Sequence, residues 1–245
     1  MKLVYTIVDA VLDFIYPRNI YCLLCEKPIK TDDEYSLCDE CRGKIEWIKK
    51  PICDVCGKPL DENYDNESCV DCLNNSHMFT KGLSSIVYNG NIKRVVHNFK
   101  YHNKRYIGYH MAEIITDTLR QNKIDYIDYI VPVPMHKNKK RQRGFNQSSI
   151  IAKYIARNMD LNFNDKNLIK IRDTSEQNKL NKKERFENLK GAFHLNSTDL
   201  FREKEILLVD DIYTTGNTVD ACCEALNKAN PKAIYIASFA TGKNS

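Results

Sequence analysis

The residues best suited to chemistry stand together in a segment that begins at residue 206 and reads ILLVDDIYTTGNTV. Its first four residues, 206–209, are all apolar, which predicts a strand buried on both faces of a parallel sheet. Asp210 and Asp211 follow at the carboxyl end of that strand, where open α/β sheets bind ligands. Because two adjacent carboxylates can accept hydrogen bonds from a vicinal diol, the segment predicts a diol-binding site.

A turn suited to a phosphate group follows the two acids. It offers three hydroxyl groups, an amide side chain and a glycine that allows close approach of the backbone. Its members are Thr214, Thr215, Gly216, Asn217 and Thr218. The apolar spacing of the next residues predicts a helix, whose N-terminal amides and dipole favour an anion. A diol site beside a phosphate site predicts ribose 5-phosphate as the ligand.

The same segment resembles the motif with which type I phosphoribosyltransferases bind 5-phosphoribosyl 1-diphosphate (PRPP): a hydrophobic strand, two acids and T-T-G-x-T. The resemblance implies that Asp210 and Asp211 are catalytic, holding the ribose hydroxyls and orienting Mg²⁺, while residues 214–218 hold the 5-phosphate. It also implies transfer of the pentosyl group, in which a nucleophile displaces diphosphate from carbon 1. The alternative interpretation is a solvated acidic loop after an ordinary strand.

A basic run, MHKNKKRQRGFNQ, follows a strand predicted at residues 129–134. Its bases are Lys137, Lys139, Lys140, Arg141 and Arg143. Such runs are usually solvated loops, but this one stands at the end of a strand, as the two acids do, so a polyanion contact is expected. Arg143 is the first candidate for the diphosphate, because a guanidinium can grip two phosphate oxygens.

Eight of the ten cysteines form four C-x-x-C pairs in a tandem duplication, because each recurs 31 residues later. The two sets are Cys22, Cys25, Cys38 and Cys41, and Cys53, Cys56, Cys69 and Cys72. This spacing predicts two structural tetrahedral zinc sites, with disulfides as the alternative that a reducing compartment disfavours. Ligation within each repeat costs less loop entropy, although interleaved pairing satisfies the same spacing.

Charge divides the chain. Residues 17–76 hold 8 Lys and Arg against 13 Asp and Glu, whereas residues 77–245 hold 28 against 17. We expect an amphipathic N-terminal helix at residues 1–16, a double zinc-knuckle domain at residues 17–76 and a ligand-binding domain at residues 77–245. The basic domain suits a polyanion, and the acidic zinc module suits a protein partner better than it suits a phosphate.

No apolar run is long enough to span a membrane, so we expect no membrane insertion. Asp9 and Asp13 interrupt the first apolar stretch, which is unlike a secretory signal. These features favour a cytoplasmic location.

Apolar strand and helix patterns alternate after residue 80. Strands are expected at 83–88, 129–134, 206–209 and 233–240, and helices at 92–99, 109–119 and 147–157. Residues 160–203 are polar with weak periodicity. The alternation predicts an α/β domain with a doubly wound parallel sheet.

A series of short motifs follows the double cysteine module: Lys100-Tyr101, V-P-V-P at 131–134, R-G-F-N-Q at 143–147, Thr174/Gln177/Leu180, Arg185/Asn188 and G-A-F at 191–193. The order of these motifs resembles the ComF family along nearly the whole chain. The resemblance implies a role in DNA uptake during natural transformation, with no assigned acceptor. Three functions stay open: a phosphoribosyltransferase, a non-catalytic PRPP sensor, and an accessory that handles single-stranded DNA and docks a protein of the competence machinery through the zinc module.

Overall fold

A computed structural model describes residues 20–30, 33–102, 104–174 and 188–243. The chain divides into two compact units, Met1–Glu46 and Trp47–Ser245. The helix expected at residues 1–16 lies outside the described residues, as do Gln177, Leu180 and Arg185 of the family motifs. Within the described ranges, no helix is long and apolar enough to cross a bilayer.

The first unit is built around the first cysteine repeat. Tyr21 and Pro28 form an antiparallel bridge, a short 3-10 helix η1 spans Glu34–Ser36, and α2 spans Asp39–Gly43. Its small interior contains Cys22, Leu24, Leu37, Cys41 and Ile45. With so few apolar side chains, such a unit needs a cross-link or a metal to hold its loops.

The second unit contains a five-stranded sheet in the order β1-β7-β6-β2-β3, with every pair parallel. The strands are β1 (Lys81–Val87), β2 (Tyr129–Pro132), β3 (Asn162–Phe163), β6 (Glu205–Tyr213) and β7 (Ala233–Thr241). The non-sequential order arises from helical crossovers, which parallel strands require. The predicted doubly wound parallel sheet is confirmed.

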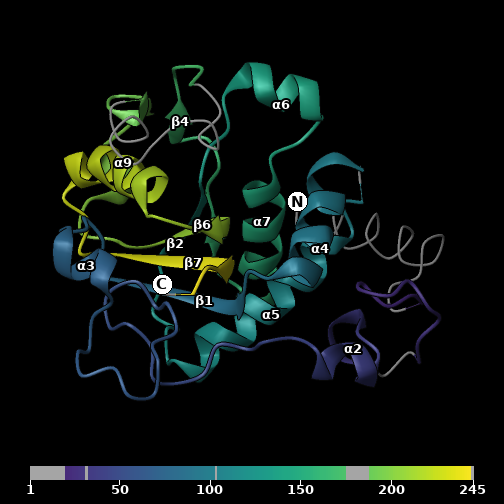
Figure 1. The fold of residues 1–245 in the computed structure, drawn as a ribbon. Helices are drawn as coiled ribbons and strands as arrows, with labels where there is room; N and C mark the ends of the chain where they lie inside the picture. Colours follow the sequence, from purple (N-terminus) through teal and green to yellow (C-terminus); the bar gives the residue numbers. More distant parts are fainter. Residues whose placement is uncertain (1–19, 31–32, 103, 175–187, 244–245) are drawn as a thin grey trace. The chain divides into compact units, whose positions relative to one another are not determined.

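Helices cover both faces of this sheet (Figure 1). The main ones are α4 (Gly90–Tyr101), α5 (Ile107–Gln121), α7 (Gln147–Met159) and α9 (Asn217–Leu226). Helices α5 and α7 pack on one face. Alternate residues of the central strand, Ile206 and Leu208, join a core cluster that contains α9 and none of α5 or α7, so α9 packs on the other face.

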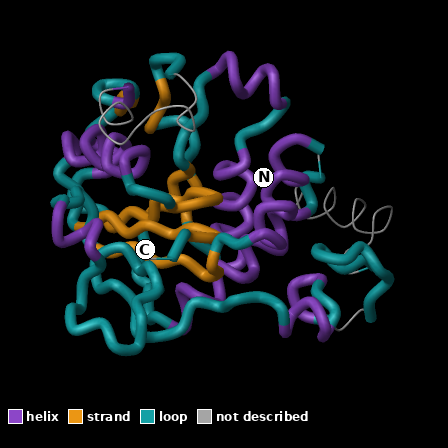
Figure 2. Tube along the Cα trace, in the orientation of Figure 1, coloured by secondary structure: helices purple, strands orange, loops and turns teal. Residues whose placement is uncertain are grey.

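The second cysteine repeat belongs to the same unit as the sheet. Figure 2 draws it almost entirely as loop, because α3 (Val70–Asn74) is its one regular element longer than a bridge among the described residues. Cys53, Cys56 and Cys69 are members of the core cluster that contains α9. This repeat therefore covers part of the α9 face of the sheet.

Two segments differ from the sequence-based expectation. The basic run forms a helix, α6 (Lys137–Arg143), which Gly144 ends with a left-handed φ of 85° while its amide donates to the Lys140 carbonyl. Residues 160–203 contain β3, the antiparallel pair β4 (Leu168–Lys170) and β5 (Phe193–Leu195), and a 3-10 turn, η3, at Asp199–Phe201. Strands this short leave almost no periodic signal.

Candidate functional site

Strand β6 carries the two predicted acids at the point where its neighbour β2 ends. The β2 pairing stops at Pro132 and Val209, whereas β7 stays paired with β6 as far as Tyr213. The strand therefore continues through Asp210 and Asp211, beyond its predicted end at Val209. Because β2 has ended, the side of β6 toward β2 opens at the carboxyl end of the sheet, where α/β folds bind ligands.

The two acids have different partners. Ser148 Oγ donates a hydrogen bond of 2.8 Å to Asp210 Oδ1, and the backbone amide of Asp211 donates to the same oxygen at 2.9 Å. Lys100 Nζ forms an ion pair of 2.5 Å with Asp211 Oδ2. The first carboxylate is thus held by neutral donors and the second by a cation.

These partners shape the protonation of the site. Burial, followed by the neighbouring charge of Asp211, raises the pKa of Asp210 to about 7. Burial lowers the pKa of Lys100, but the Asp211 carboxylate outweighs burial and the pKa is raised overall. Lys100 therefore stays charged at neutral pH, while Asp210 can gain or lose a proton there.

A cavity of about 280 Å³ joins the acids to basic side chains. Four of the predicted site residues line it, namely Asp210, Asp211, Thr218 and Arg143. The other predicted phosphate ligands, Thr214, Thr215, Gly216 and Asn217, lie in the turn directly after β6 and do not line this cavity.

Arg143, the last residue of α6, is fixed at the wall of this cavity by two contacts. Its Nη1 donates to Gln147 Oε1 at 2.9 Å, and its guanidinium lies 5.0 Å from the centre of the Tyr101 ring. A guanidinium held on one face by an aromatic ring keeps other N–H groups available for an anion.

Lys100, Ser148 and Lys170 also line the cavity and were not predicted as site residues. Lys100 belongs to the Lys100-Tyr101 element, which the sequence showed without a role. Ser148 comes directly after R-G-F-N-Q, and Lys170 ends the short strand β4. Burial lowers the pKa of Lys170, whose Nζ donates to Thr174 Oγ1 at 2.7 Å. Neither Ser148 nor Lys170 has a sequence signal of its own.

The turn after β6 requires its glycine. Gly216 has a φ of 83° and is the N-cap of α9, where it supplies no side-chain acceptor to the first-turn amides. A Cβ at this position would lie 2.7 Å from the Tyr213 hydroxyl. A glycine N-cap leaves the first-turn amides of α9 without a side-chain acceptor from that residue, which is compatible with the predicted anion site.

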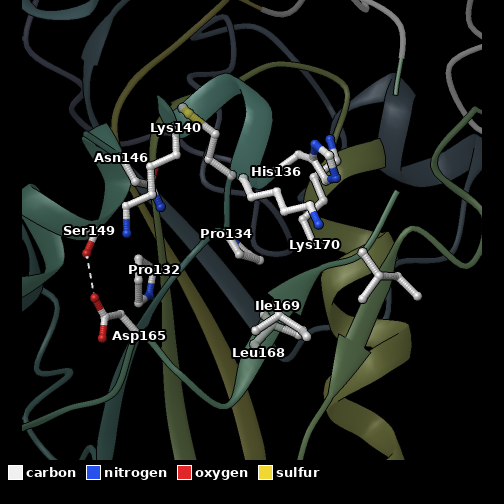
Figure 3. Close-up of a pocket in the computed structure, with 13 residues that line it drawn as sticks. Pro132, Pro134, His136, Lys140, Asn146, Ser149, Asp165, Leu168, Ile169 and Lys170 are labelled. Atoms are coloured by element: carbon white, nitrogen blue, oxygen red, sulfur yellow. Dashed lines mark hydrogen bonds between the residues drawn. The ribbon is translucent and has the colours of Figure 1, made fainter. Parts of the chain in front are cut away.

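A second cavity, of about 430 Å³, adjoins the first and shares residues such as Pro134, His136 and Lys170 with it. Figure 3 shows its apolar wall of Pro132, Pro134, Leu168 and Ile169, with the amino groups of Lys140 and Lys170 and a hydrogen bond from Ser149 to Asp165 at its edges. Apolar surface beside cations suits a ligand with a flat apolar part and an anionic part.

The cysteines gather in two groups, each from a single repeat: Cys22, Cys25, Cys38 and Cys41, and Cys53, Cys56, Cys69 and Cys72. Within each group all four sulfurs lie within 4.8 Å of one another. Neighbouring sulfurs are 3.5 to 3.8 Å apart. A tetrahedron with Zn–S bonds of about 2.3 Å has edges of about 3.8 Å, so both groups fit a zinc site with four thiolate ligands. Because each group comes from one repeat, the structure fits zinc ligation within each repeat and not interleaved ligation.

Two family descriptions match the chain. Residues 11–73 match the Double zinc ribbon domain, and residues 145–245 match the Phosphoribosyl transferase domain. The first match spans both cysteine groups. The second begins at Phe145 and includes the two acids and the threonine turn.

Curated relatives are similar along most of the chain. Competence protein F of Haemophilus influenzae is 28% identical over 89% of this chain and 95% of its own length. Competence protein ComFC of Bacillus subtilis is 26% identical over 91% of this chain and 94% of its own length. DNA utilization protein YhgH of Escherichia coli K12 is 24% identical over 88% of this chain and 94% of its own length. A solved purine phosphoribosyltransferase of Pyrococcus horikoshii aligns with 54% of this chain and 70% of its own, at 18% identity and a TM-score of 0.34. The chain therefore resembles the ComF family, as its motifs predict: it combines matches to a double zinc ribbon and a phosphoribosyltransferase domain with similarity to two competence proteins over about nine tenths of its length.

Proposed function

We propose that this chain binds Mg²⁺-PRPP at the carboxyl end of β6 and supports DNA uptake in natural transformation. The observation that carries the binding proposal is one cavity that brings two adjacent carboxylates together with Lys100, Arg143 and the first turn of α9. The role in DNA uptake is supported by relatives whose names refer to competence and DNA utilization.

The proposed pose follows the alternation of charge in the site. PRPP has a phosphate, a diol and a diphosphate, so it needs anion donors at both ends and acceptors between them. The turn at residues 214–218 would hold the 5-phosphate, Asp210 and Asp211 would accept from the ribose hydroxyls, and Arg143 would receive the diphosphate. Lys100 would exchange Asp211 for a diphosphate oxygen when the ligand arrives.

If the chain is a transferase, its residues act by position and charge. As the bond from carbon 1 to the diphosphate breaks, positive charge develops on the sugar and negative charge on the leaving group. Asp210 and Asp211 would stabilise the first charge, and Lys100 and Arg143 would stabilise the second. Bound Mg²⁺ would supply positive charge that offsets part of the diphosphate charge.

Calorimetric titration of PRPP with Mg²⁺ into the zinc-loaded protein tests the proposal. We expect one saturable site, and we expect Asp210→Asn/Asp211→Asn to abolish it while zinc content and unfolding midpoint stay unchanged. Absence of heat from the wild-type protein, or equal binding by the double variant, would contradict the assignment. Diphosphate release with a panel of bases then separates a transferase from a non-catalytic PRPP sensor.

A second candidate function, binding of single-stranded DNA, is favoured by aromatic exposure among the bases. Of the four aromatic residues near the basic run, Phe99 and Phe145 are buried, whereas Tyr101 and Tyr106 are 63% and 52% exposed. Exposed rings beside cations are suited to stacking on bases. Salt-dependent binding of single-stranded DNA that survives Asp210→Asn/Asp211→Asn, and weakens on Lys137→Gln/Lys140→Gln, would support this function.

The zinc module is also proposed to contact a protein of the competence machinery, in a cytoplasmic location that would keep its thiols reduced. The first repeat is one candidate surface, because Tyr21 is 59% exposed there. Cross-linking at Tyr21 in competent cells would test this contact. If the Tyr21→Ser variant is cross-linked to the same proteins as the wild type, the proposed contact is contradicted.

A further inference from the structure

The second zinc ribbon reaches the back of the proposed phosphate-binding turn through a continuous set of contacts. The first of these contacts joins the ribbon to the sheet. The Gly82 amide donates to the Val55 carbonyl at 2.7 Å, which ties the loop between Cys53 and Cys56 to β1. Gly57, with a φ of 71°, and Gly82 lie so close that a Cβ on either would collide with backbone. The ribbon loop therefore cannot shift independently of the strand.

The second contact runs through Tyr213, the residue directly before the turn. Its side chain is buried in the same core cluster as Cys53, Cys56 and Cys69. Its ring meets the Phe79 ring edge-on at 6.4 Å, and Lys58 Nζ of the ribbon lies 6.0 Å from its centre. On its other side the Tyr213 hydroxyl fills the space in which a Cβ of Gly216 would stand. The Tyr213 side chain thus contacts the ribbon on one side and the turn on the other.

The third contact is His77, in the segment between the ribbon and β1. Its Nδ1 lies 2.9 Å from the carboxylate of Asp220 in the first turn of α9. Its ring stacks on Phe79 with centroids 4.9 Å apart, and its Cε1 would be 2.9 Å from a Cβ on Gly216. An unpaired carboxylate in the first turn would repel a phosphate at that helix end, and His77 gives the Asp220 carboxylate a hydrogen-bond partner there.

We propose that the second ribbon, through Tyr213 and His77 as positioning residues, sets the geometry of the turn at residues 214–218. Metal in the second four-cysteine site is then required for full affinity toward a sugar phosphate, and metal in the first site is not. The proposal rests on the proposed function, because it assumes that the turn receives a phosphate.

Two probes divide the ligand into its halves: ribose 5-phosphate, which reports on the turn, and Mg²⁺-diphosphate, which reports on Lys100 and Arg143. The matched variants are Cys53→Ser/Cys56→Ser in the second ribbon and Cys22→Ser/Cys25→Ser in the first. We expect the second-ribbon variant to bind ribose 5-phosphate at least about tenfold more weakly. It should keep its diphosphate affinity, and the first-ribbon variant should keep both affinities. Equal effects of the two variants on ribose 5-phosphate would overturn the proposal.

A milder pair keeps the test decisive if the second-ribbon variant does not fold. His77 Nε2 has no hydrogen-bond partner among the described residues, so Asn, which reproduces only the Nδ1 donor, should suffice. We expect His77→Ala to weaken ribose 5-phosphate binding and to shift the ³¹P resonance of the bound phosphate, and His77→Asn to restore both. His110→Ala is the matched control, because His110 Nδ1 bonds Glu113 at the same distance of 2.9 Å on α5.

An unchanged resonance and affinity in His77→Ala, or an equal loss in His110→Ala, would reject the positioning role. Failure of the wild-type protein to bind either ribose 5-phosphate or PRPP would instead reject the proposed function, and the inference with it.

Discussion

The two zinc ribbons share one local structure and differ in what they are packed into. In both, the amide of the first cysteine donates to a lysine carbonyl at 2.8 Å, and a short helix begins directly after the third cysteine. The first ribbon forms a unit with its own small interior, whereas three cysteines of the second are fully buried in the core of the sheet domain. Ligand spacing therefore determines the metal site, and the residues between the ligands determine where the site packs.

Position 57 illustrates this difference. The equivalent residue of the first repeat is Glu26, which also has a positive φ, of 59°, and is exposed. The second repeat has Gly57, whose missing Cβ lets the loop touch the backbone of β1. The glycine thus serves packing more than turn formation, since a glutamate adopts the same turn 31 residues earlier.

Removing two metal ligands from each ribbon in turn should give the largest difference in stability between the two ribbons. We expect Cys53→Ser/Cys56→Ser to lower the free energy of unfolding of residues 47–245 by several kcal/mol, because a structural zinc site contributes on the order of 10 kcal/mol of binding free energy. Denaturant unfolding followed by Trp47, the single tryptophan, measures this. Cys22→Ser/Cys25→Ser should leave that transition in place, and an equal loss in both variants would show that the ribbons are not different.

Exchanging Gly57 and Glu26, the residues that follow the second cysteine of each repeat, should have the next largest effect on the free energy of unfolding. Gly57→Glu copies the first repeat and should cost about 2 to 4 kcal/mol, from a left-handed residue that costs about 1–2 kcal/mol and a collision with the Gly82 carbonyl. The reverse change, Glu26→Gly, should be neutral or slightly stabilising. Thermal unfolding of both variants tests the pair, and a tolerated Gly57→Glu would argue against the contact between ribbon and strand.

Substitution of the next residue, Lys58 in the second ribbon and Lys27 in the first, should reveal a smaller difference in stability between the ribbons. Lys58 is buried and pairs with Asp71 at 2.9 Å, whereas its counterpart Lys27 is exposed. Because Asp71 keeps some solvent contact, Lys58→Met should destabilise by about 1–3 kcal/mol, and Lys27→Met by less than about 0.5 kcal/mol. Equal unfolding midpoints of the two variants would contradict the difference in burial.

The last expected effect is a pH dependence of the unfolding free energy that comes from Asp210. The pKa of Asp210 is raised to about 7 in the folded protein, whereas an ordinary Asp in the unfolded chain has a pKa of about 4. Between these two pH values the folded protein holds a proton that the unfolded chain has released. Folded molecules then bind more protons between those values, and the stability contributed by Asp210 falls as the pH rises through that window. Asp210→Asn should remove this slope in a pH series of unfolding curves, while Cys22→Ser/Cys25→Ser should retain it.

The affinity for Mg²⁺-PRPP should change with pH in the opposite direction to the stability. In the proposed pose the ionised Asp210 carboxylate accepts from the ribose, so the affinity for Mg²⁺-PRPP should rise by up to about tenfold per pH unit below about pH 7 and level off above it. Calorimetry across that range checks this. An affinity independent of pH would mean that the acid is already ionised in the free protein.

The sequence predicts the parallel sheet, both zinc sites and the two acids because each has a local signal: apolar runs, repeated C-x-x-C pairs, and adjacent aspartates after a strand. Three features lacked such a signal. Strand β6 continues to Tyr213 because β7 pairs with it that far, which is a property of the partner strand. Lys170 and Ser148 reach the cavity only through the tertiary fold. The burial of the second ribbon depends on contacts of Gly57 and Tyr213 with residues far away in the chain.

The most direct test of the account is a crystal structure of the zinc-loaded protein with Mg²⁺ and PRPP. We predict density for the 5-phosphate at residues 214–218, ribose hydroxyls on Asp210 and Asp211, and diphosphate beside Arg143, with Lys100 released from Asp211. Density for PRPP elsewhere on the chain, or an empty crevice at β6 in crystals grown with saturating ligand, would contradict it.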